Sequence, residues 1–217
     1  MCALSARTII SDDEIIVVYD MDDVLWGYSE VAAKCAGVDI NKWTNFHVEA
    51  VQEFTHEQRL ELRAVIGRTD FYDQIEFYPG VDEILRPQEL SPRVRVEINS
   101  NVVSEQATGK KRVRLYEAIP RLTERNLVFG LVHSGNPAST LHKQFNPKAL
   151  IVTDDSPYNI IVSPAPHNIL PTKPWNTSLS AVRLLESSPI SYRYASDLRA
   201  INQMVYTLVE DYLRQAS

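Results

Sequence analysis

The chain has 217 residues, enough for one compact α/β domain with room for a modest insertion. Hydrophobic residues make up 44% of it and charged residues 23%, as in an ordinary globular protein, and the formal net charge is -6. This balance argues against a broad nucleic-acid surface, which needs an excess of Lys and Arg on one face. A small anionic substrate remains compatible with it, because a bound divalent cation reverses the local sign of the field.

The beginning of the chain and its cysteines predict a cytoplasmic protein. The first residues, MCALSARTIISDDE, contain no long apolar core and become acidic early, unlike a secretory signal peptide. No apolar run approaches the roughly 20 residues that a membrane span requires. Cys2 and Cys35 are interpreted as two reduced thiols rather than a disulfide framework. We therefore expect a cytoplasmic location and no membrane partner.

Four apolar runs predict the strands of a parallel sheet. In chain order they are residues 15–19, 94–98, 127–132 and 149–153. The first, IIVVY, is a continuous run of the kind that a parallel sheet buries on both faces. The runs end in polar residues, which is where a doubly wound sheet gathers its chemistry.

Helical patterns separate and follow these runs. Residues 114–125, 177–186 and 196–214 are predicted to be helices, and Ser196 is predicted to be the N-cap of the last one. Strands that alternate with helices indicate an α/β fold of the Rossmann type, with a parallel sheet and helices on both faces.

Residues 30–78 have a different character from the rest of the chain. They are rich in Glu, Gln, Arg and aromatic residues and contain few β-branched runs. We interpret them as a small helical cap, inserted into a core domain that consists of residues 1–29 and 79–217.

Acidic pairs follow two of the predicted strands. Asp20 and Asp22 follow the first strand, and Asp154 and Asp155 follow the fourth. Four carboxylates at the ends of buried strands repel one another unless they share a cation. Magnesium suits such an oxygen-rich site. An Asp can also attack phosphorus to form an aspartyl-phosphate, while a second Asp protonates the leaving oxygen and later activates water.

Polar and basic residues add a candidate phosphate site. Ser100 and Asn101 follow the second predicted strand, where a hydroxyl and backbone N–H groups can hold phosphate oxygens. Lys143, ahead of the fourth strand, can neutralise the phosphate and the attacking carboxylate, and Lys148 competes for this role.

Two further features are interpreted as structural. Residues 110–112, KKR, form a basic cluster that we interpret as the solvated start of a helix rather than as a guide for substrate. Packing inside the cap is the simpler account of the aromatic side chains in the insertion, although these could also line a base or sugar pocket. They are Trp43, Phe46, His47 and Phe54.

Together, the motifs resemble those of the haloacid-dehalogenase superfamily. VVYDMDDVL at residues 17–25 is similar to its first motif. INSN at residues 98–101 resembles its Ser/Thr motif, with Asn99 or Ser100 at the position of the family's hydroxyl residue. Lys143 matches its basic motif, and IVTDDSPYNI at residues 151–160 its acidic motif. The motifs occur in the family's order over roughly residues 14–176.

The resemblance implies a role for each matched residue. Asp20 would be the nucleophile and Asp22 the general acid and base. Magnesium would be held by Asp20, by the backbone carbonyl of Asp22, and by Asp154 or Asp155.

Within that superfamily, the chain is most similar to the 5'(3')-deoxyribonucleotidases. DMDDVLWGY at residues 20–28 is similar to their DMDGVLADF, and EFYPGVDEIL at residues 76–85 to their junction between cap and core. The likeness implies hydrolysis of nucleoside monophosphates, with the ring of Tyr28 against the base. The chain departs from that family at Asp23, where a glycine is usual, and at Ile66, where a base-pocket tryptophan would lie.

We therefore expect a magnesium-dependent phosphomonoester hydrolase whose partner is a small phosphorylated substrate, in the first instance a deoxynucleoside monophosphate. The alternatives are a phosphatase of the same fold for another small phosphate, such as a sugar phosphate, and a non-catalytic protein that binds a phosphate ligand. A phospho-signalling receiver is disfavoured, because its acidic pair precedes its acceptor Asp. The sequence predicts no nucleic-acid polymer as partner and leaves the oligomeric state open, a homodimer included.

Overall fold

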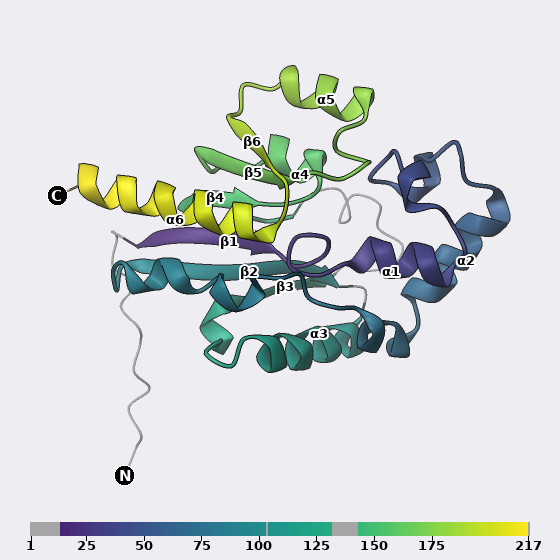
Figure 1. The fold of residues 1–217 in the computed structure, drawn as a ribbon, viewed down its shortest axis with the longest axis horizontal. Helices are drawn as coiled ribbons and strands as arrows, with labels where there is room; N and C mark the ends of the chain where they lie inside the picture. Colours follow the sequence, from purple (N-terminus) through teal and green to yellow (C-terminus); the bar gives the residue numbers. More distant parts are fainter. Residues whose placement is uncertain (1–13, 103, 132–142, 217) are drawn as a thin grey trace, which may run out of the picture.

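Parallel strands form the centre of the protein in a computed structural model that describes residues 14–102, 104–131 and 143–216. The strands are β1 (Ile15–Asp20), β2 (Val94–Val102), β3 (Leu127–Leu131), β4 (Ala149–Thr153), β5 (His167–Pro171) and β6 (Tyr192–Ala195). They form one sheet with the order β3-β2-β1-β4-β5-β6, in which every neighbouring pair is parallel (Figure 1). The predicted parallel sheet is confirmed.

Helices cover both faces of this sheet, as predicted. They are α1 (Tyr28–Cys35), α2 (His56–Ile66), α3 (Glu105–Ala118), α4 (Pro157–Ile161), α5 (Leu179–Glu186) and α6 (Leu198–Gln215). Side chains of β1 alternate between two hydrophobic clusters, because successive residues of a strand point to opposite faces. Ile15, Val17 and Tyr19 pack with residues of α3 and α6. Ile16 and Val18 pack with residues of α4 and α5.

The strand predictions hold best where the apolar run is continuous. β1 and β4 agree with the predicted runs to within one residue. β2 continues to Val102, so residues 99–101 lie inside the strand rather than after it, because β3 pairs with them. β5 and β6 were missed by the sequence patterns, since their runs are short and contain polar residues. Val132 of the predicted third strand lies outside the described residues.

The helix predictions err at the helix starts. The helix predicted over residues 114–125 is confirmed for residues 114–118, whereas residues 119–125 lie beyond its end. In the structure, α3 begins at Glu105 and ends at Ala118. Ser104 is its N-cap, because the hydroxyl oxygen of Ser104 accepts a hydrogen bond from the backbone N–H of Ala107. Pro120 explains why the helix does not continue, because proline lacks the N–H that a helix interior needs. Within the described ranges, every helix is too short or too polar to cross a bilayer.

The N-cap of α6 is Asp197, so the prediction of Ser196 is wrong. Asp197 Oδ1 accepts a hydrogen bond from the backbone N–H of Ala200 at 2.9 Å. The hydroxyl of Ser196 instead donates to Asp197 Oδ2 at 2.9 Å. The helix therefore begins two residues later than predicted.

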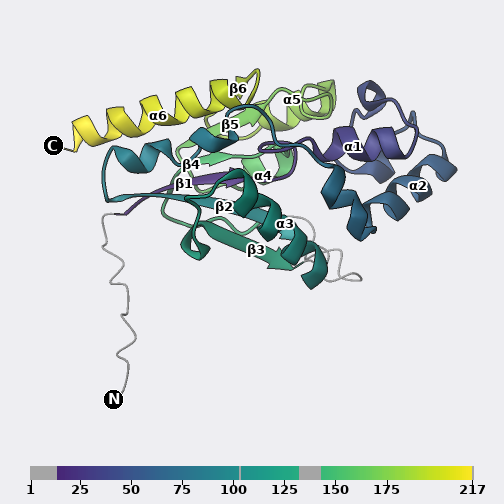
Figure 2. The same cartoon turned by 60° about the horizontal axis from the view of Figure 1, so that its bottom comes forward.

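The segment between β1 and β2 is helical and leaves and rejoins the sheet through paired connections. It contains α1, α2 and short 3-10 turns, and it lies beyond the carboxyl ends of the strands in both views (Figures 1 and 2). Trp26 and Phe77 form an antiparallel bridge between the outgoing and returning connections. The backbone N–H of Tyr78 donates to the carbonyl of Leu25 at 2.8 Å. The segment is therefore tied to the core at its base, next to the end of β1.

We predict that Asp197→Ala lowers the free energy of unfolding by about 1 kcal/mol, because the first turn of α6 loses its side-chain acceptor. Urea titration followed by circular dichroism measures this change. Ser196→Ala is the matched control and should change the free energy by less than about 0.5 kcal/mol. A greater loss in Ser196→Ala than in Asp197→Ala would contradict this assignment of the cap.

Candidate active site

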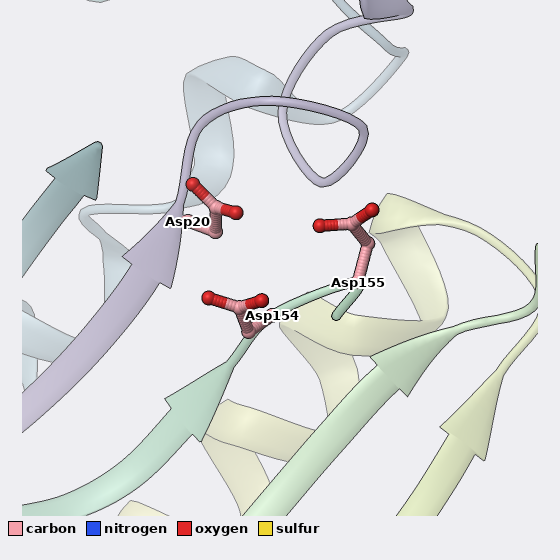
Figure 3. A group of neighbouring side chains, drawn as sticks. All are labelled: Asp20, Asp154 and Asp155. Carbon is pink, nitrogen blue, oxygen red and sulfur yellow. The ribbon is translucent and has the colours of Figure 1, made fainter. Parts of the chain in front are cut away.

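The carboxyl ends of β1 and β4 bring three buried carboxylates together. The last paired residues of these neighbouring strands are Tyr19 and Thr153, so Asp20 and Asp154 lie at the same edge of the sheet. One oxygen from each of Asp20, Asp154 and Asp155 lies within 4.8 Å of the other two. Figure 3 shows the three side chains directed into a common space. Three of the four aspartates that the sequence singled out therefore meet.

Burial makes this cluster unfavourable when all its carboxylates are ionised. Desolvation raises the pKa of Asp20 to about 7, against the opposing charge of Lys143. Burial, reinforced by the charges of Asp23 and Asp154, raises the pKa of Asp155 well above its ordinary value. Three carboxylates around one ammonium leave an excess of negative charge, which a divalent cation would neutralise. Their oxygen atoms fit the ligand preference of magnesium.

Lys143 is the ammonium within this cluster. Its Nζ forms an ion pair with Asp20 and lies 3.1 Å from Asp154 Oδ2. Burial lowers the pKa of Lys143, but the charges of Asp154 and Asp20 outweigh that effect and hold the pKa above its ordinary value. The side chain is therefore a buried positive charge at a fixed place. Lys148, its competitor in the sequence, is exposed.

Neighbouring polar groups orient the acidic pair. Asp154 Oδ1 accepts hydrogen bonds from the backbone N–H of Ser156 at 2.9 Å and from Asn159 Nδ2 at 3.0 Å. Asp155 Oδ2 accepts one from Trp175 Nε1 at 2.8 Å. Both oxygens of Asp154 are thus engaged, one by the start of α4 and the other by the lysine.

Asp22 lies beside the cluster, and its carboxylate is held by other partners. Its Oδ1 accepts a hydrogen bond from Trp26 Nε1 at 2.8 Å, and its Oδ2 one from Lys111 Nζ at 2.5 Å. The side chain is 26% exposed and lines the same cavity as Asp20. The predicted metal contact of Asp22, through its backbone carbonyl, stays a prediction.

The interpretation of residues 110–112 as a solvated helix start is wrong for Lys111. This side chain is buried. Its Nζ lies 2.8 Å from Ser100 Oγ and 3.3 Å from the backbone oxygen of Asn101, in addition to its contact with Asp22. A second buried ammonium therefore belongs to the site.

The spacing of the buried residues in α3 is the signal that would have found Lys111. Ala107, Lys111 and Leu115 are four residues apart and form the buried face of this helix. A helix predicted to start at residue 114 leaves the lysine outside that pattern.

The residues of the predicted Ser/Thr motif have three different environments. Asn99 Nδ2 donates to the backbone oxygen of Gln144 at 2.9 Å, and Ser100 is fully buried. Asn101 lines the cavity next to the carboxylates. It also packs closely on β3, since a Cβ atom on Gly130 would lie 2.8 Å from Asn101 Oδ1. Of these three side chains, Asn101 is the one placed to contact a ligand in the cavity.

Asp23 adopts a left-handed backbone conformation, with φ of 58°. Glycine adopts this conformation readily because it lacks a Cβ. The glycine that the sequence comparison leads us to expect at this position therefore suits the backbone. The carboxylate accepts hydrogen bonds from the backbone N–H of Ser29 at 2.9 Å and from its hydroxyl at 2.5 Å. Burial raises the pKa of Asp23 to about 6, although Lys173 and Ser29 oppose the rise.

A cavity of about 230 Å³ lies in front of the strand ends. Rings and aliphatic side chains from the helical segment and the segment after β5 form its apolar lining: Tyr28, Trp43, Phe46, Val48, Ile66 and Trp175. Both interpretations of Trp43 apply, because its ring lies 5.9 Å from that of Phe54 and also lines the cavity. The Tyr28 ring contacts Phe71 edge to face, at 5.1 Å between centroids.

A larger cavity, of about 590 Å³, shares Asp23 and Trp175 with the first. Lys173 and Arg199 contribute positive charge to its lining. The three clustered carboxylates line none of it, so the candidate chemistry lies in the smaller cavity.

Solved structures with a similar fold include haloacid-dehalogenase-like hydrolases. One from Streptococcus pneumoniae has a TM-score of 0.52 at 15% identity, covering 89% of this chain and 100% of that chain. One from Bacteroides fragilis has a TM-score of 0.50 at 11% identity, covering 86% of this chain and 99% of that chain. One from Burkholderia xenovorans LB400 has a TM-score of 0.50 at 15% identity, covering 91% and 98%. This chain has a haloacid-dehalogenase-like fold.

No protein-family model matches the chain, and no curated protein matches it either. The similarity therefore concerns the haloacid-dehalogenase-like fold, and the activity has to be argued from the site itself.

We predict that the metal-free protein becomes more stable as the pH falls from about 8 to about 5. Folding raises the pKa of Asp20 to about 7 and that of Asp23 to about 6, from 3.8 in each case. In this window the folded state binds protons that the unfolded state has lost, so stability present at low pH is lost as the pH rises. Thermal melts in EDTA measure the trend.

Magnesium should raise the melting temperature most at the alkaline end of that window, where the three clustered carboxylates are ionised. Asp23→Asn should flatten the pH dependence, because it removes one raised carboxyl group. A melting temperature that rises with pH in EDTA would contradict this electrostatic account.

Proposed function

We propose that this protein is a magnesium-dependent phosphomonoester hydrolase that works through an aspartyl-phosphate on Asp20. The observation that carries the proposal is the group of three buried carboxylates around Lys143 at the ends of β1 and β4. This arrangement combines a nucleophile, a cation site and a fixed positive charge within a few ångströms. The haloacid-dehalogenase-like fold supports it as an analogy.

Asp20 is the proposed nucleophile. One of its carboxylate oxygens attacks the phosphorus atom of the ester, and the bond from phosphorus to the leaving oxygen breaks. Asp22 donates a proton to that leaving oxygen, then accepts a proton from the water that attacks the aspartyl-phosphate. Phosphate is released and the Asp20 carboxylate is regenerated.

Asp20 and Asp155 are the proposed side-chain ligands of the metal, with the backbone carbonyl of Asp22 as a third. Asp155 is preferred to Asp154 because both oxygens of Asp154 already accept hydrogen bonds. A bound divalent cation supplies charge neutralisation for the phosphate and the attacking carboxylate. Lys143 reinforces that effect by holding its ammonium against Asp20.

Asn101 and Lys143 are the proposed phosphate contacts, since both line the cavity beside Asp20. Ser100 has a supporting role in this proposal, because its hydroxyl is buried and accepts a hydrogen bond from Lys111. We further propose that residues 30–78 act as a cap, because side chains from this segment form part of the cavity wall.

The proposed substrate is a deoxynucleoside monophosphate, and nucleotides with a pyrimidine base are expected to be among the better substrates. Tyr28, Trp43 and Phe46 put aromatic rings into the wall of the cavity, and aromatic rings bind bases by stacking. The volume of about 230 Å³ favours a second candidate, a smaller phosphate ester such as a sugar phosphate, because ligand pockets commonly span roughly 300–1,000 Å³.

We predict that turnover of phosphate esters requires a divalent cation and the Asp20 carboxylate. Protein stripped with EDTA should lose activity and regain it with magnesium. Asp20→Asn should lower the turnover number by at least about 10³-fold, because an amide cannot act as the nucleophile. Asp82→Asn is a matched control at an exposed aspartate and should keep nearly full activity. Full activity in EDTA, or in Asp20→Asn, would rule out the proposed mechanism.

We predict that Tyr28→Ala lowers kcat/KM for deoxyuridine and deoxythymidine monophosphates by roughly tenfold to hundredfold, the loss expected from removing a stacking partner. Rates for sugar phosphates should change much less. Tyr28→Phe keeps the ring and should keep the nucleotide rates. Faster turnover of sugar phosphates in the parent, with nucleotide rates unaffected in Tyr28→Ala, would favour the second candidate substrate.

A further inference from the structure

A buried ammonium that has no role in the proposed mechanism lies beside Asp22. Lys111 comes from α3, in the middle of the buried face of that helix. Its side chain is 2% exposed, compared with 26% for that of Asp22. An unpaired ammonium is unfavourable in such an environment, so the partners of this group have to offset its desolvation.

The partners of Lys111 come from two different parts of the site. Its Nζ lies 2.5 Å from Asp22 Oδ2, on the loop after β1, and 2.8 Å from Ser100 Oγ, on β2. The backbone oxygen of Asn101, at 3.3 Å, is a third acceptor. Lys111 therefore links the loop that carries Asp22 to the neighbouring strand.

This link fixes the direction of the Asp22 carboxylate. Oδ2 is held by Lys111, and Oδ1 accepts a hydrogen bond from Trp26 Nε1 at 2.8 Å. One oxygen is held by the connection after β1 and the other by α3, so rotation of the carboxylate breaks at least one hydrogen bond. The Lys111 ammonium also lies 5.6 Å from the centroid of the Tyr28 ring, which limits its own movement.

We propose that Lys111 is a positioning residue for Asp22, which keeps the carboxylate of the general acid and base beside the leaving oxygen and away from the three clustered carboxylates. The inference rests on the proposed function. Lys143 and Lys111 then have separate tasks: the first serves the nucleophile and the second serves the acid and base. Their contacts support this division, because Lys143 pairs with Asp20 and Lys111 with Asp22.

This role predicts a dependence on the leaving group. The parameter kcat/KM reports the steps up to departure of the leaving group. An alkoxide needs a proton in order to leave, whereas p-nitrophenolate leaves without one. A side chain that positions the proton donor therefore matters for alkyl phosphates and little for p-nitrophenyl phosphate.

The experiment measures kcat/KM for p-nitrophenyl phosphate and for an alkyl phosphate, with magnesium, in the parent, Lys111→Met, Asp22→Asn and the double variant. Lys110→Met is the matched control, because Lys110 is the preceding residue on α3 but pairs with Asp73 on the surface. Circular dichroism melts establish that each variant is folded. If Lys111→Met is not, Lys111→Gln replaces it and should show the same pattern more weakly.

We expect Lys111→Met to lose at least about tenfold more kcat/KM on the alkyl phosphate than on p-nitrophenyl phosphate, as part of the roughly 10²–10⁴-fold that a general acid contributes. Asp22→Asn should show the same selectivity, and the double variant should lose little more than Asp22→Asn alone, because the lysine acts through the carboxylate. Lys110→Met should retain the parent values for both esters.

Equal losses on both esters in Lys111→Met would overturn the inference, because they indicate direct contact with the phosphate or a general effect on the fold. Additive losses in the double variant would overturn it as well. A parent protein that hydrolyses neither p-nitrophenyl phosphate nor any alkyl phosphate, deoxynucleoside monophosphates and sugar phosphates included, would instead overturn the proposed function, and the inference with it.

Discussion

Ionised carboxylates repel one another most strongly where water is excluded, and β1 and β4 deliver three of them to one buried place. Their positions follow from the pairing of these strands, which puts Asp20 and Asp154 at the same edge of the sheet. Lys143 offsets only part of this charge. Burial, reinforced by the repulsion among these carboxylates, raises the pKa of Asp20 and Asp155. A divalent cation would neutralise the ionised carboxylates.

Much of the surrounding structure serves to hold charges in fixed directions. The start of α4 holds Asp154, and the indole of Trp175 holds Asp155. Lys111 reaches in from α3 to hold Asp22. These supports come from elements on both sides of β1 in the sheet order, so the site depends on the complete sheet rather than on one loop. Hydrogen bonds to ionised groups are stronger than neutral ones, which makes such contacts suitable for orienting a reactive group.

The sequence was most informative where one physical cause dominates. A continuous apolar run predicts a strand buried on both faces, and β1 and β4 were predicted nearly to the residue. The acidic residues after them could be predicted as a cluster, because parallel strands end at the same edge. β5 and β6 could not be predicted, because their runs are short and contain polar residues, and they are strands through their pairing with β4 and with each other.

Lys111 was missed for a related reason. A lysine in a basic cluster is most often solvated, and only its partners across the fold make burial tolerable. Those partners, Asp22 and Ser100, lie 89 and 11 residues away in the sequence. The four-residue spacing on α3 is visible in the sequence, but it indicates a buried face only if the helix begins before Ala107. The start of the helix is set by its capping residue, Ser104.

The central claim is that Asp20 receives the phosphoryl group. A crystal structure of the protein with magnesium and beryllofluoride, which mimics a phosphoryl group bound to a carboxylate, tests this claim most directly. The account predicts beryllium bonded to an oxygen of Asp20, with the metal between Asp20 and Asp155. Beryllofluoride bonded to Asp22 or Asp23, or bound in the cavity without a bond to Asp20, would contradict it.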